Sequence, residues 1–253
     1  REEDNDSDSG ADVRSDTDVM IDTSALTGTK GLARIMRFTD SITPKIKGNF
    51  AYRTEKHGRI FSPEHIGKYS SKIKTICDHI MQSTGIVLVY SQWLDSGLIP
   101  MALALEELGF KGTAGKSLFA TPPTEEIDST TMKKRDQPGG DDTSFYPAKY
   151  ALITGDERLS PDNDADIKAL TDEKNKDGKY VKVVLISKAA SEGIDLKCVR
   201  QIHILEPWYT MSRIEQIIGR GVRNFSHALL PFEERNVEIF LHTTLLNDRE
   251  LES

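Results

Sequence analysis

The stretch that decides the fold is MSRIEQIIGRGVR, at residues 211–223. Its apolar residues recur every three to four positions, which predicts an amphipathic helix over residues 210–222. The polar side of this helix forms a stripe, and its one acid, Glu215, lies away from that stripe. Because like charges repel, unneutralised arginines side by side indicate a bound anion, most plausibly phosphate. A solvated face with acidic partners elsewhere is the alternative. The stripe consists of Arg213, Gln216, Arg220 and Arg223.

The segments around this helix alternate between short apolar runs and amphipathic stretches. The run IVLVY at residues 86–90 is typical of a strand buried on both faces. Helices alternating with strands predict an α/β fold: a doubly wound, mostly parallel, RecA-like sheet with helices on both faces. The strand ends Ser91, Thr154, Ser187 and Glu206 would then open onto one edge. We expect further helices at residues 67–83, 98–108 and 164–172, and further strands at residues 116–120, 150–154, 181–187, 200–205 and 237–242.

Charge is distributed unevenly along the 253 residues. The first 24 residues carry nine acids and two arginines, a composition that predicts a disordered acidic tail. The net charge of −7 comes entirely from this tail, so any basic track elsewhere must be local. A chain that begins in such a tail is expected to be a fragment whose remainder lies upstream. We expect an ordered linker at residues 25–66, a domain at 67–246 with a polar surface insertion at about 121–147, and a C-terminal tail at 247–253.

Several classes of protein and site are disfavoured. Cys77 and Cys198 lie far apart, so neither a zinc site nor a disulfide framework is indicated. Neither a signal peptide nor a run of about 20 apolar residues is present, which predicts a soluble protein of a reducing compartment without a membrane partner. In the segment GFKGTAGKS at residues 109–117, five residues separate Gly109 from Gly115, whereas a phosphate loop has four at this place. The segment also follows a predicted helix, whereas a phosphate loop follows a strand. The sequence therefore contains no segment that would anchor ATP.

Two motifs in this sequence resemble those of a known family. QxxGRxxR, from Gln216 to Arg223, is similar to motif VI of superfamily 2 helicases. SKAASEGIDL at residues 187–196, about twenty residues earlier, resembles motif V. Further segments narrow the resemblance to the helicase-like ATPases of large cytoplasmic DNA viruses, which include the poxvirus early-transcription ATPases. These segments are residues 58–63, 85–92 (like motif IV), 152–156, 202–209 and 230–236, and the resemblance covers roughly residues 31–246.

The resemblance implies the C-terminal, second RecA-like domain of an ATP-dependent helicase or translocase, inactive without the rest of the protein. ATP and Mg²⁺ would be held mainly by the missing N-terminal RecA-like domain. Arg220 and Arg223 would reach the γ-phosphate as arginine fingers, supported by Gln216. Glu192, Gly193 and Asp195 would lie near the nucleotide. The residues implied to contact the backbone of DNA or RNA are Ser91, Gln92, Thr154, Gly155 and Ser187. Viral transcription machinery would be a further partner, in the cytoplasmic viral factory or the virion.

Alternatives remain open for single residues and for the whole chain. Gly193 and Asp195 also suit a tight turn with a capping aspartate, and the hydroxyl residues also suit strand-end caps. Trp93 and Trp208 are able to stack on bases, although core packing is the favoured interpretation. A non-catalytic nucleic-acid or transcription-complex binding module would retain the fold but would not need two unpaired arginines. An unrelated nucleotide- or metabolite-binding α/β protein would usually show an early GxGxxG turn, which this sequence lacks.

Overall fold

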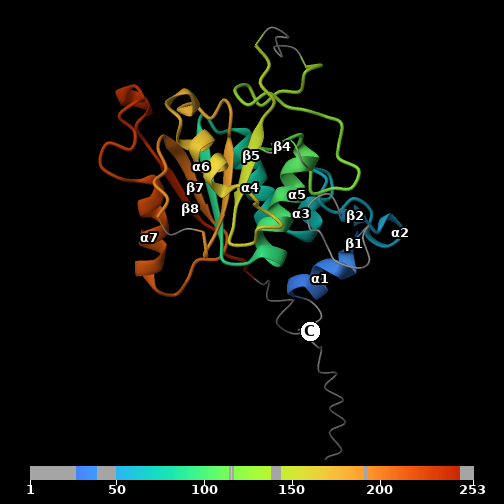
Figure 1. The fold of residues 1–253 in the computed structure, drawn as a ribbon. Coiled ribbons are helices and arrows are strands. Elements are labelled where there is room, and N and C mark those ends of the chain that lie inside the picture. Colours follow the sequence, from blue (N-terminus) through green and yellow to red (C-terminus); the bar gives the residue numbers. More distant parts are fainter. Residues whose placement is uncertain are drawn as a thin grey trace, which may run out of the picture.

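A computed structural model of the chain describes residues 27–38, 50–113, 115, 117–137, 144–190 and 193–245. Its centre is a six-stranded sheet in the order β4-β5-β6-β3-β7-β8, and every neighbouring pair is parallel (Figure 1). The α/β class predicted from the sequence is therefore confirmed. The strands are β3 (Ile86–Ser91), β4 (Lys111–Gly112), β5 (Lys149–Ile153), β6 (Val183–Ser187), β7 (Val199–Ile204) and β8 (Glu238–Leu241).

Helices cover both faces of this sheet. On one face, α4 (Ser71–Met81) and α5 (Ile99–Leu108) pack against alternate strand residues such as Val87 and Leu185. On the other face, α6 (Asn163–Thr171) and α7 (Met211–Gly221) pack against residues such as Leu88 and Ile202. Successive strand residues point to opposite faces, so strands buried on both sides must be apolar throughout. The run at β3 is apolar for this reason.

A smaller unit precedes the sheet in the chain. It consists of α1 (Gly28–Ile35), the antiparallel strands β1 (Met36–Phe38) and β2 (Phe50–Tyr52), and the short helices α2 (Thr54–His57) and α3 (Ile66–Tyr69). Its side chains Leu32, Met36 and Phe50 are buried in the same core cluster as α4 and α5. The segment expected to be a linker thus folds against the sheet, on the side away from α7 (Figure 1).

Two expected elements differ from the structure. The helix expected at residues 67–83 is broken into α3 and α4 at Ser70, whose extended backbone and hydroxyl cap α4 by accepting from the Ile73 amide at 3.2 Å. The strand expected at residues 116–120 is wrong in its described part, where Phe119 makes one isolated bridge to Phe50. The buried carboxylate of Glu106 holds this segment instead, accepting from the Leu118 amide at 2.7 Å. The predicted terminal tails at 1–24 and 247–253 lie outside the described residues.

The polar insertion expected at about 121–147 is anchored to the domain in its described part. Ile127 and Met132 are buried in the core cluster, which a purely solvent-facing segment would not allow. Asp128 is 4% exposed and accepts backbone hydrogen bonds from Thr131 at 2.7 Å and Tyr146 at 2.8 Å. These bonds favour the charged carboxylate and lower its pKa although burial acts in the opposite direction. The described part of this segment is therefore partly packed into the core, whereas the sequence predicted a surface insertion.

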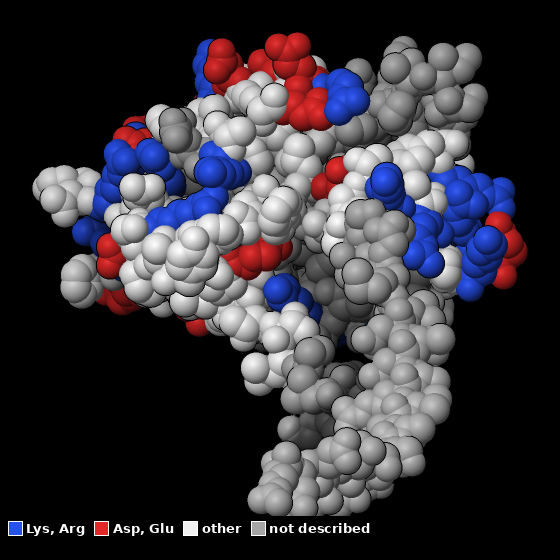
Figure 2. Space-filling model, turned by 90° about the horizontal axis from the view of Figure 1, so that it is seen from below, with Lys and Arg blue, Asp and Glu red and all other residues white. Residues whose placement is uncertain are grey.

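The register of the sheet brings the predicted strand-end residues to one edge. Ser91 at the end of β3 pairs with Ser187 at the end of β6. Ile153 pairs with Ile186, so Thr154 follows at the level of Ser187. Glu206 follows β7 on the other side of β3. We call this the carboxyl edge, and it faces the reader in Figure 2. No helix in the described part of the chain is long and apolar enough to span a bilayer.

Candidate nucleotide and nucleic-acid interface

Helix α7 presents the candidate nucleotide residues. Ile214 and Ile217 are buried against the sheet, which fixes the rotation of the helix and turns its polar side outward. Gly221 at its end lies so close to β7 that an added Cβ would be 3.2 Å from Ile202 Cδ1. A glycine at this position lets the last turn approach the strand. The polar residues of α7 are therefore held on a helix that is packed tightly at its C-terminal end.

The polar stripe of α7 separates into three different environments. Arg213 lies over the ring of Trp208, 4.8 Å from its centroid, and lines a small closed hollow with Tyr90 and Glu206. Its Nη2 is buried without a hydrogen-bond partner. Gln216 is exposed and Arg220 is half-buried. The interpretation of three equivalent guanidiniums around one anion is therefore wrong for Arg213, because tertiary packing turns that side chain towards Trp208.

Arg223 and Asp195 form an ion pair. About half of each side chain is exposed, at 48% and 64% respectively. Arg223 Nε also donates to the Gly219 carbonyl at 2.9 Å, which holds the guanidinium against the end of α7. The expectation that the stripe is unneutralised is thus wrong for Arg223. The partner comes from motif V, so the structure joins the two motifs that the sequence analysis treated separately.

Arg220 differs from its neighbour. Its guanidinium makes no hydrogen bond or ion pair with any residue in the described ranges. Its carbonyl accepts from the Leu196 amide at 3.0 Å, which fixes the end of the motif V segment to α7.

Gly193 is exposed with φ of +81°, a conformation that favours glycine. Glu192, also expected near the nucleotide, lies outside the described residues.

Among the predicted backbone contacts, Ser91 is engaged inside the protein. Its hydroxyl donates to Glu206 Oε2 at 2.8 Å and accepts from the Trp93 amide at 3.0 Å, and the residue is 0% exposed. Burial raises the pKa of Glu206, although the bond from Ser91 and the charge of Lys72 lower it. Gln92 is half-buried beside this pair. The strand-end cap, which the sequence left open as an alternative, describes Ser91 in this structure.

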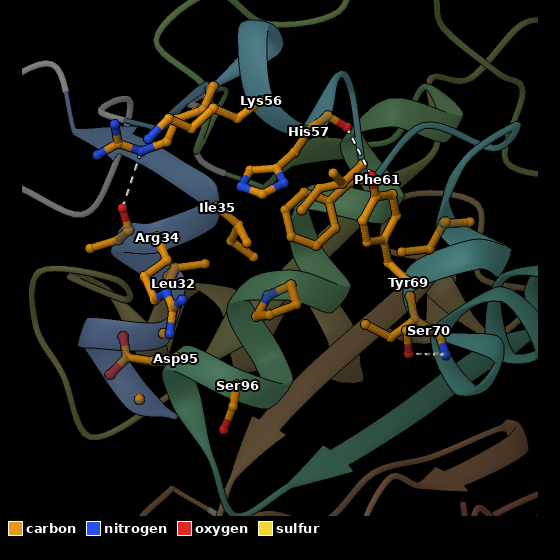
Figure 3. Close-up of a pocket in the computed structure, with 18 residues that line it drawn as sticks. Leu32, Arg34, Ile35, Lys56, His57, Phe61, Tyr69, Ser70, Asp95 and Ser96 are labelled. Carbon is orange, nitrogen blue, oxygen red and sulfur yellow. Dashed lines mark hydrogen bonds between the residues drawn. The ribbon is translucent and has the colours of Figure 1, made fainter. Parts of the chain in front are cut away.

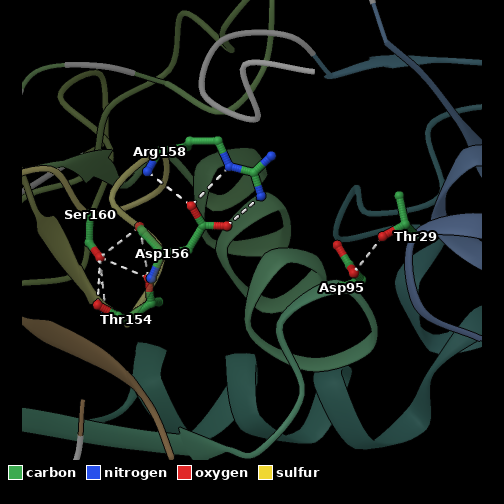
Figure 4. A network of polar contacts seen from close by, with 6 residues as sticks. All are labelled: Thr29, Asp95, Thr154, Asp156, Arg158 and Ser160. Atoms are coloured by element: carbon green, nitrogen blue, oxygen red, sulfur yellow. Dashed lines mark hydrogen bonds and ion pairs between the residues drawn. The ribbon is translucent and has the colours of Figure 1, made fainter. Parts of the chain in front are cut away.

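Thr154 is held in a similar way. Its Oγ1 lies 2.8 Å from Ser160 Oγ, and its amide donates to the same oxygen at 3.0 Å (Figure 4). Gly155 is exposed on the carboxyl edge. The next residue, Asp156, accepts hydrogen bonds from Arg158 Nε at 3.0 Å and from Arg158 Nη2 at 2.6 Å. This bidentate pairing lowers the pKa of Asp156. The Asp156–Arg158 pair escaped the sequence analysis, and its only sequence signal is the i, i+2 spacing of opposite charges.

Ser187 stands apart because its hydroxyl is unsatisfied. The residue is 4% exposed, and its Oγ has no hydrogen-bond partner in the structure. A buried hydroxyl without a partner costs free energy, so such groups usually have a ligand or water to bond. Of the three hydroxyl residues predicted at the carboxyl edge, Ser187 is the one whose hydrogen-bonding capacity is unused.

The segment that superficially resembles a phosphate loop has a different role. Ser117 Oγ donates to Glu106, and the Phe119 amide donates to the same carboxylate at 3.3 Å. With the Leu118 amide and Tyr150, which donates at 2.7 Å, Glu106 accepts four hydrogen bonds. A buried carboxylate at this position would repel phosphate. In addition, no cluster of three or more His, Cys, Asp or Glu side chains suited to a metal ion occurs in the described ranges.

A parallel sheet with motif V and motif VI residues joined beside its carboxyl edge defines a helicase-type C-terminal domain. Residues 145–225 match the family described as "Helicase conserved C-terminal domain". The chain is also similar to helicase-like proteins of large DNA viruses, which confirms the resemblance predicted from the two motifs.

Two viral relatives illustrate this similarity. The Termination factor NPH-I homolog of African swine fever virus (isolate Tick/South Africa/Pretoriuskop Pr4/1996) is 33% identical over 193 residues, covering 71% of this chain and 26% of that protein. Nucleoside triphosphatase I of Heliothis armigera entomopoxvirus is 41% identical over 86 residues, 34% of this chain and 13% of that protein. The chain thus spans about a quarter or less of these relatives. The crystal structure of the C-terminal part of the Fun30 ATPase domain overlaps with a TM-score of 0.43 at 16% identity, over 71% of this chain and 46% of that one.

Proposed function

We propose that this chain is the second RecA-like domain of an ATP-dependent nucleic-acid motor. ATP and Mg²⁺ bind mainly to a separate RecA-like domain, and this chain supplies Arg220 from the last turn of α7 and Arg223 from just after it to the nucleotide. The observation that carries the proposal is the guanidinium of Arg220, which has no partner among the described residues and lies on a helix whose rotation is fixed by buried isoleucines. A guanidinium held in this way is ready to bind phosphate oxygens with two parallel hydrogen bonds.

The two arginines have distinct resting states in this proposal. Arg220 has no competing partner among the described residues, whereas Arg223 must leave Asp195 before it reaches a phosphate. The cost of breaking the Arg223–Asp195 pair is small, because an exposed ion pair contributes about 0–1 kcal/mol. An arginine finger accelerates phosphoryl transfer by about 10³–10⁵-fold, or roughly 4–7 kcal/mol. Exchange of Asp195 for phosphate is therefore energetically feasible.

The carboxyl edge is the proposed contact for DNA or RNA. Ser187 offers a hydroxyl without a partner, and the exposed backbone at Gly155 adds a donor that bears no side chain. Hydroxyls and backbone amides bind phosphates without reading bases, which suits a motor that moves over any sequence. Ser91 and Thr154 position this edge through their internal hydrogen bonds.

Steady-state ATP hydrolysis by a protein that contains both RecA-like domains tests the proposal. Arg220→Ala should lower kcat at least about a hundredfold and leave KM for ATP nearly unchanged, because a finger acts on charge that develops in the transition state. Arg37→Ala is a matched control: Arg37 is exposed and lies in β1, on the far side of the sheet from α7 (Figure 1). Wild-type kcat in a folded Arg220→Ala variant would instead favour a non-catalytic binding module.

A further inference from the structure

A second site lies between the N-terminal unit and the carboxyl edge. An open cavity of about 970 Å³ is lined by residues of α1, α2, α3 and the π-helix η2 (Leu94–Leu98) (Figure 3). η2 follows β3 directly, so this cavity adjoins the edge proposed to contact nucleic acid. Thr29 of α1 donates to Asp95 of η2 at 2.8 Å, which holds the two sides together (Figure 4). The volume is at the upper end of the range of about 300–1,000 Å³ typical of small-molecule sites.

The cavity is lined by basic side chains and by one acid. Arg34, Arg53, Lys56 and His57 line it, whereas Asp95 is the single carboxylate among its lining residues and accepts the Thr29 hydroxyl. Arg34 and Lys56 are exposed and have no side-chain partner among the described residues. Lys and Arg gather over this part of the molecule in Figure 2, to the right. Such a surface attracts phosphate groups.

One of these cations is already fixed in orientation. Arg53 Nε donates to the carbonyls of Ala33 and Met36, each at 3.2 Å, at the end of α1. Both hydrogen bonds use Nε, and the two terminal nitrogens of Arg53 have no partner among the described residues. A guanidinium that is held at one nitrogen loses little further freedom when it binds an anion. Arg53 therefore gives the cavity a preorganised donor beside the two exposed cations.

The inner wall of the cavity is apolar and aromatic. Ile60, Phe61 and Ile73 are buried in it, and the ring of Tyr69 remains 45% exposed. Tyr69 is oriented by its hydroxyl, which donates to the His57 carbonyl at 3.0 Å. Cations beside the exposed ring of Tyr69 match a nucleotide, because phosphates pair with the cations and a base stacks on the ring. An acidic peptide would satisfy the charges but would leave the rings unused.

We infer that this cavity binds a nucleotide of a nucleic-acid strand that continues from the carboxyl edge; the inference rests on the nucleic-acid contact of the proposed function. The route between the two sites passes Arg158. Its guanidinium pairs with Asp156, close to Thr154, and interacts electrostatically with Asp95. Figure 4 shows these residues side by side. The strand would thus meet hydroxyls and backbone at the edge and cations with aromatic rings beyond it.

Fluorescence anisotropy with the whole chain tests this inference. The probe is a labelled single-stranded oligonucleotide of about 20 nucleotides, longer than a typical single-strand site, prepared as DNA and as RNA. The Arg34→Ala/Lys56→Ala variant should bind at least about tenfold more weakly, and its affinity should depend less steeply on salt by about one to two charges. Both residues are exposed and unpartnered, so the fold should be preserved, as thermal unfolding will show. The charge-matched control is Lys168→Ala/Lys174→Ala, which also removes two exposed cations, on α6 and just after it, and should bind as wild type does.

The outcomes separate this inference from the proposed function. Unchanged affinity and salt dependence in the double variant, together with weaker binding by the edge variant Ser187→Ala, would overturn the cavity and leave the edge in place. Absence of oligonucleotide binding by the wild-type chain would overturn both. Displacement of the probe from the cavity by polyglutamate, with no photo-crosslink from a 5-iodouridine oligonucleotide to residues 57–69, would assign the cavity to an acidic peptide and refute the inference. A crosslink within residues 57–69 would support it.

Discussion

Arg223, two residues past the end of α7, is paired with Asp195 of the motif V segment, and the pair joins the two sequence motifs at the surface of the domain. The neighbouring Arg220 has no such partner in the described residues. Two arginines three positions apart, one in the last turn of α7 and one just after it, therefore rest in different states. The proposed mechanism requires the paired one to exchange its carboxylate for a phosphate, and this requirement leads to the first prediction.

In a protein with both RecA-like domains, Arg223→Ala should lower kcat by at least about two orders of magnitude with little change in KM for ATP. Arg223→Lys should restore little activity, because a point charge does not reproduce the planar fork. Steady-state kinetics measures both effects. Thermal unfolding of the isolated chain should change little, since an exposed pair contributes about 0–1 kcal/mol. Near-wild-type hydrolysis in a folded Arg223→Ala variant would mean that the pair is only a surface salt bridge.

The isolated chain of 253 residues should hydrolyse ATP no faster than background. Ser117, the last residue of its Gly-Lys-Ser segment, donates to Glu106, and the described residues provide no cluster for a metal ion. Mixing it with a RecA-like domain that carries a phosphate loop should restore hydrolysis, further stimulated by nucleic acid. A phosphate-release assay on the purified chain is the measurement. Robust hydrolysis that copurifies with the chain and is lost in Arg220→Ala would contradict the division of labour proposed here.

Ser187→Ala and Thr154→Val should have opposite consequences for stability. Removing the Ser187 hydroxyl eliminates an unsatisfied buried group, so the free energy of unfolding should stay equal or rise. Thr154→Val removes a hydroxyl bonded to Ser160 and should cost about 1–3 kcal/mol. Denaturant unfolding compares the two. Only Ser187→Ala is expected to weaken oligonucleotide binding without destabilising the fold, and a marked loss of stability there would show that its hydroxyl has an internal partner.

Two glycine substitutions should also differ in sign. A Cβ at Gly97 would lie 2.1 Å from Ser91 Oγ and 2.9 Å from Ser91 Cβ, so Gly97→Ala should destabilise the domain by at least about 1–3 kcal/mol. A Cβ at Gly219, within α7, meets nothing within 4 Å. Gly219→Ala should therefore stabilise by about 0.5–1 kcal/mol through the lower entropy of the unfolded chain. Thermal unfolding distinguishes them, and equal melting temperatures would show that η2 shifts freely away from β3.

Stability should fall at mildly acidic pH because of two neighbouring histidines, His203, which is buried, and His242, which is half-buried. Burial, together with the charges of neighbouring histidines including His79, lowers the pKa of His203 to about 3, and burial lowers that of His242 to about 4. In the unfolded chain both protonate near about 6.5. The unfolded state thus binds more protons between these values, and the free energy of unfolding decreases as pH falls from about 6.5 towards 4.

Melting temperatures measured across that pH range check this dependence. His203→Gln should flatten it, because the substitution removes the more strongly perturbed group of the pair, whose ring nitrogens lie 2.9 Å apart. His242→Gln should have a smaller effect in the same direction. An equally steep dependence in both variants would assign it to carboxylates whose pKa the fold lowers, such as Asp128.

The sequence predicted those parts of the fold that depend on local periodicity. The apolar run at β3 and the helices α5, α6 and α7 lie within one or two residues of their expected bounds. Runs of this kind are constrained to be apolar on both faces or on one stripe, so their pattern is legible in the chain. The two-residue strand β4 lacks such a pattern, because it is too short to show a period.

Tertiary structure decided which of the predicted site residues remain free. A helical wheel places Arg213, Arg220 and Arg223 on one stripe. In the structure, Arg213 packs on the ring of Trp208, and Arg223 pairs with Asp195. The hydroxyls of Ser91 and Ser187 look equivalent in sequence, yet the first is bound to Glu206 and the second has no partner. Sequence periodicity determines which way a side chain points from its own element. Its partners come from other elements, at distances that only the packing of the whole chain sets.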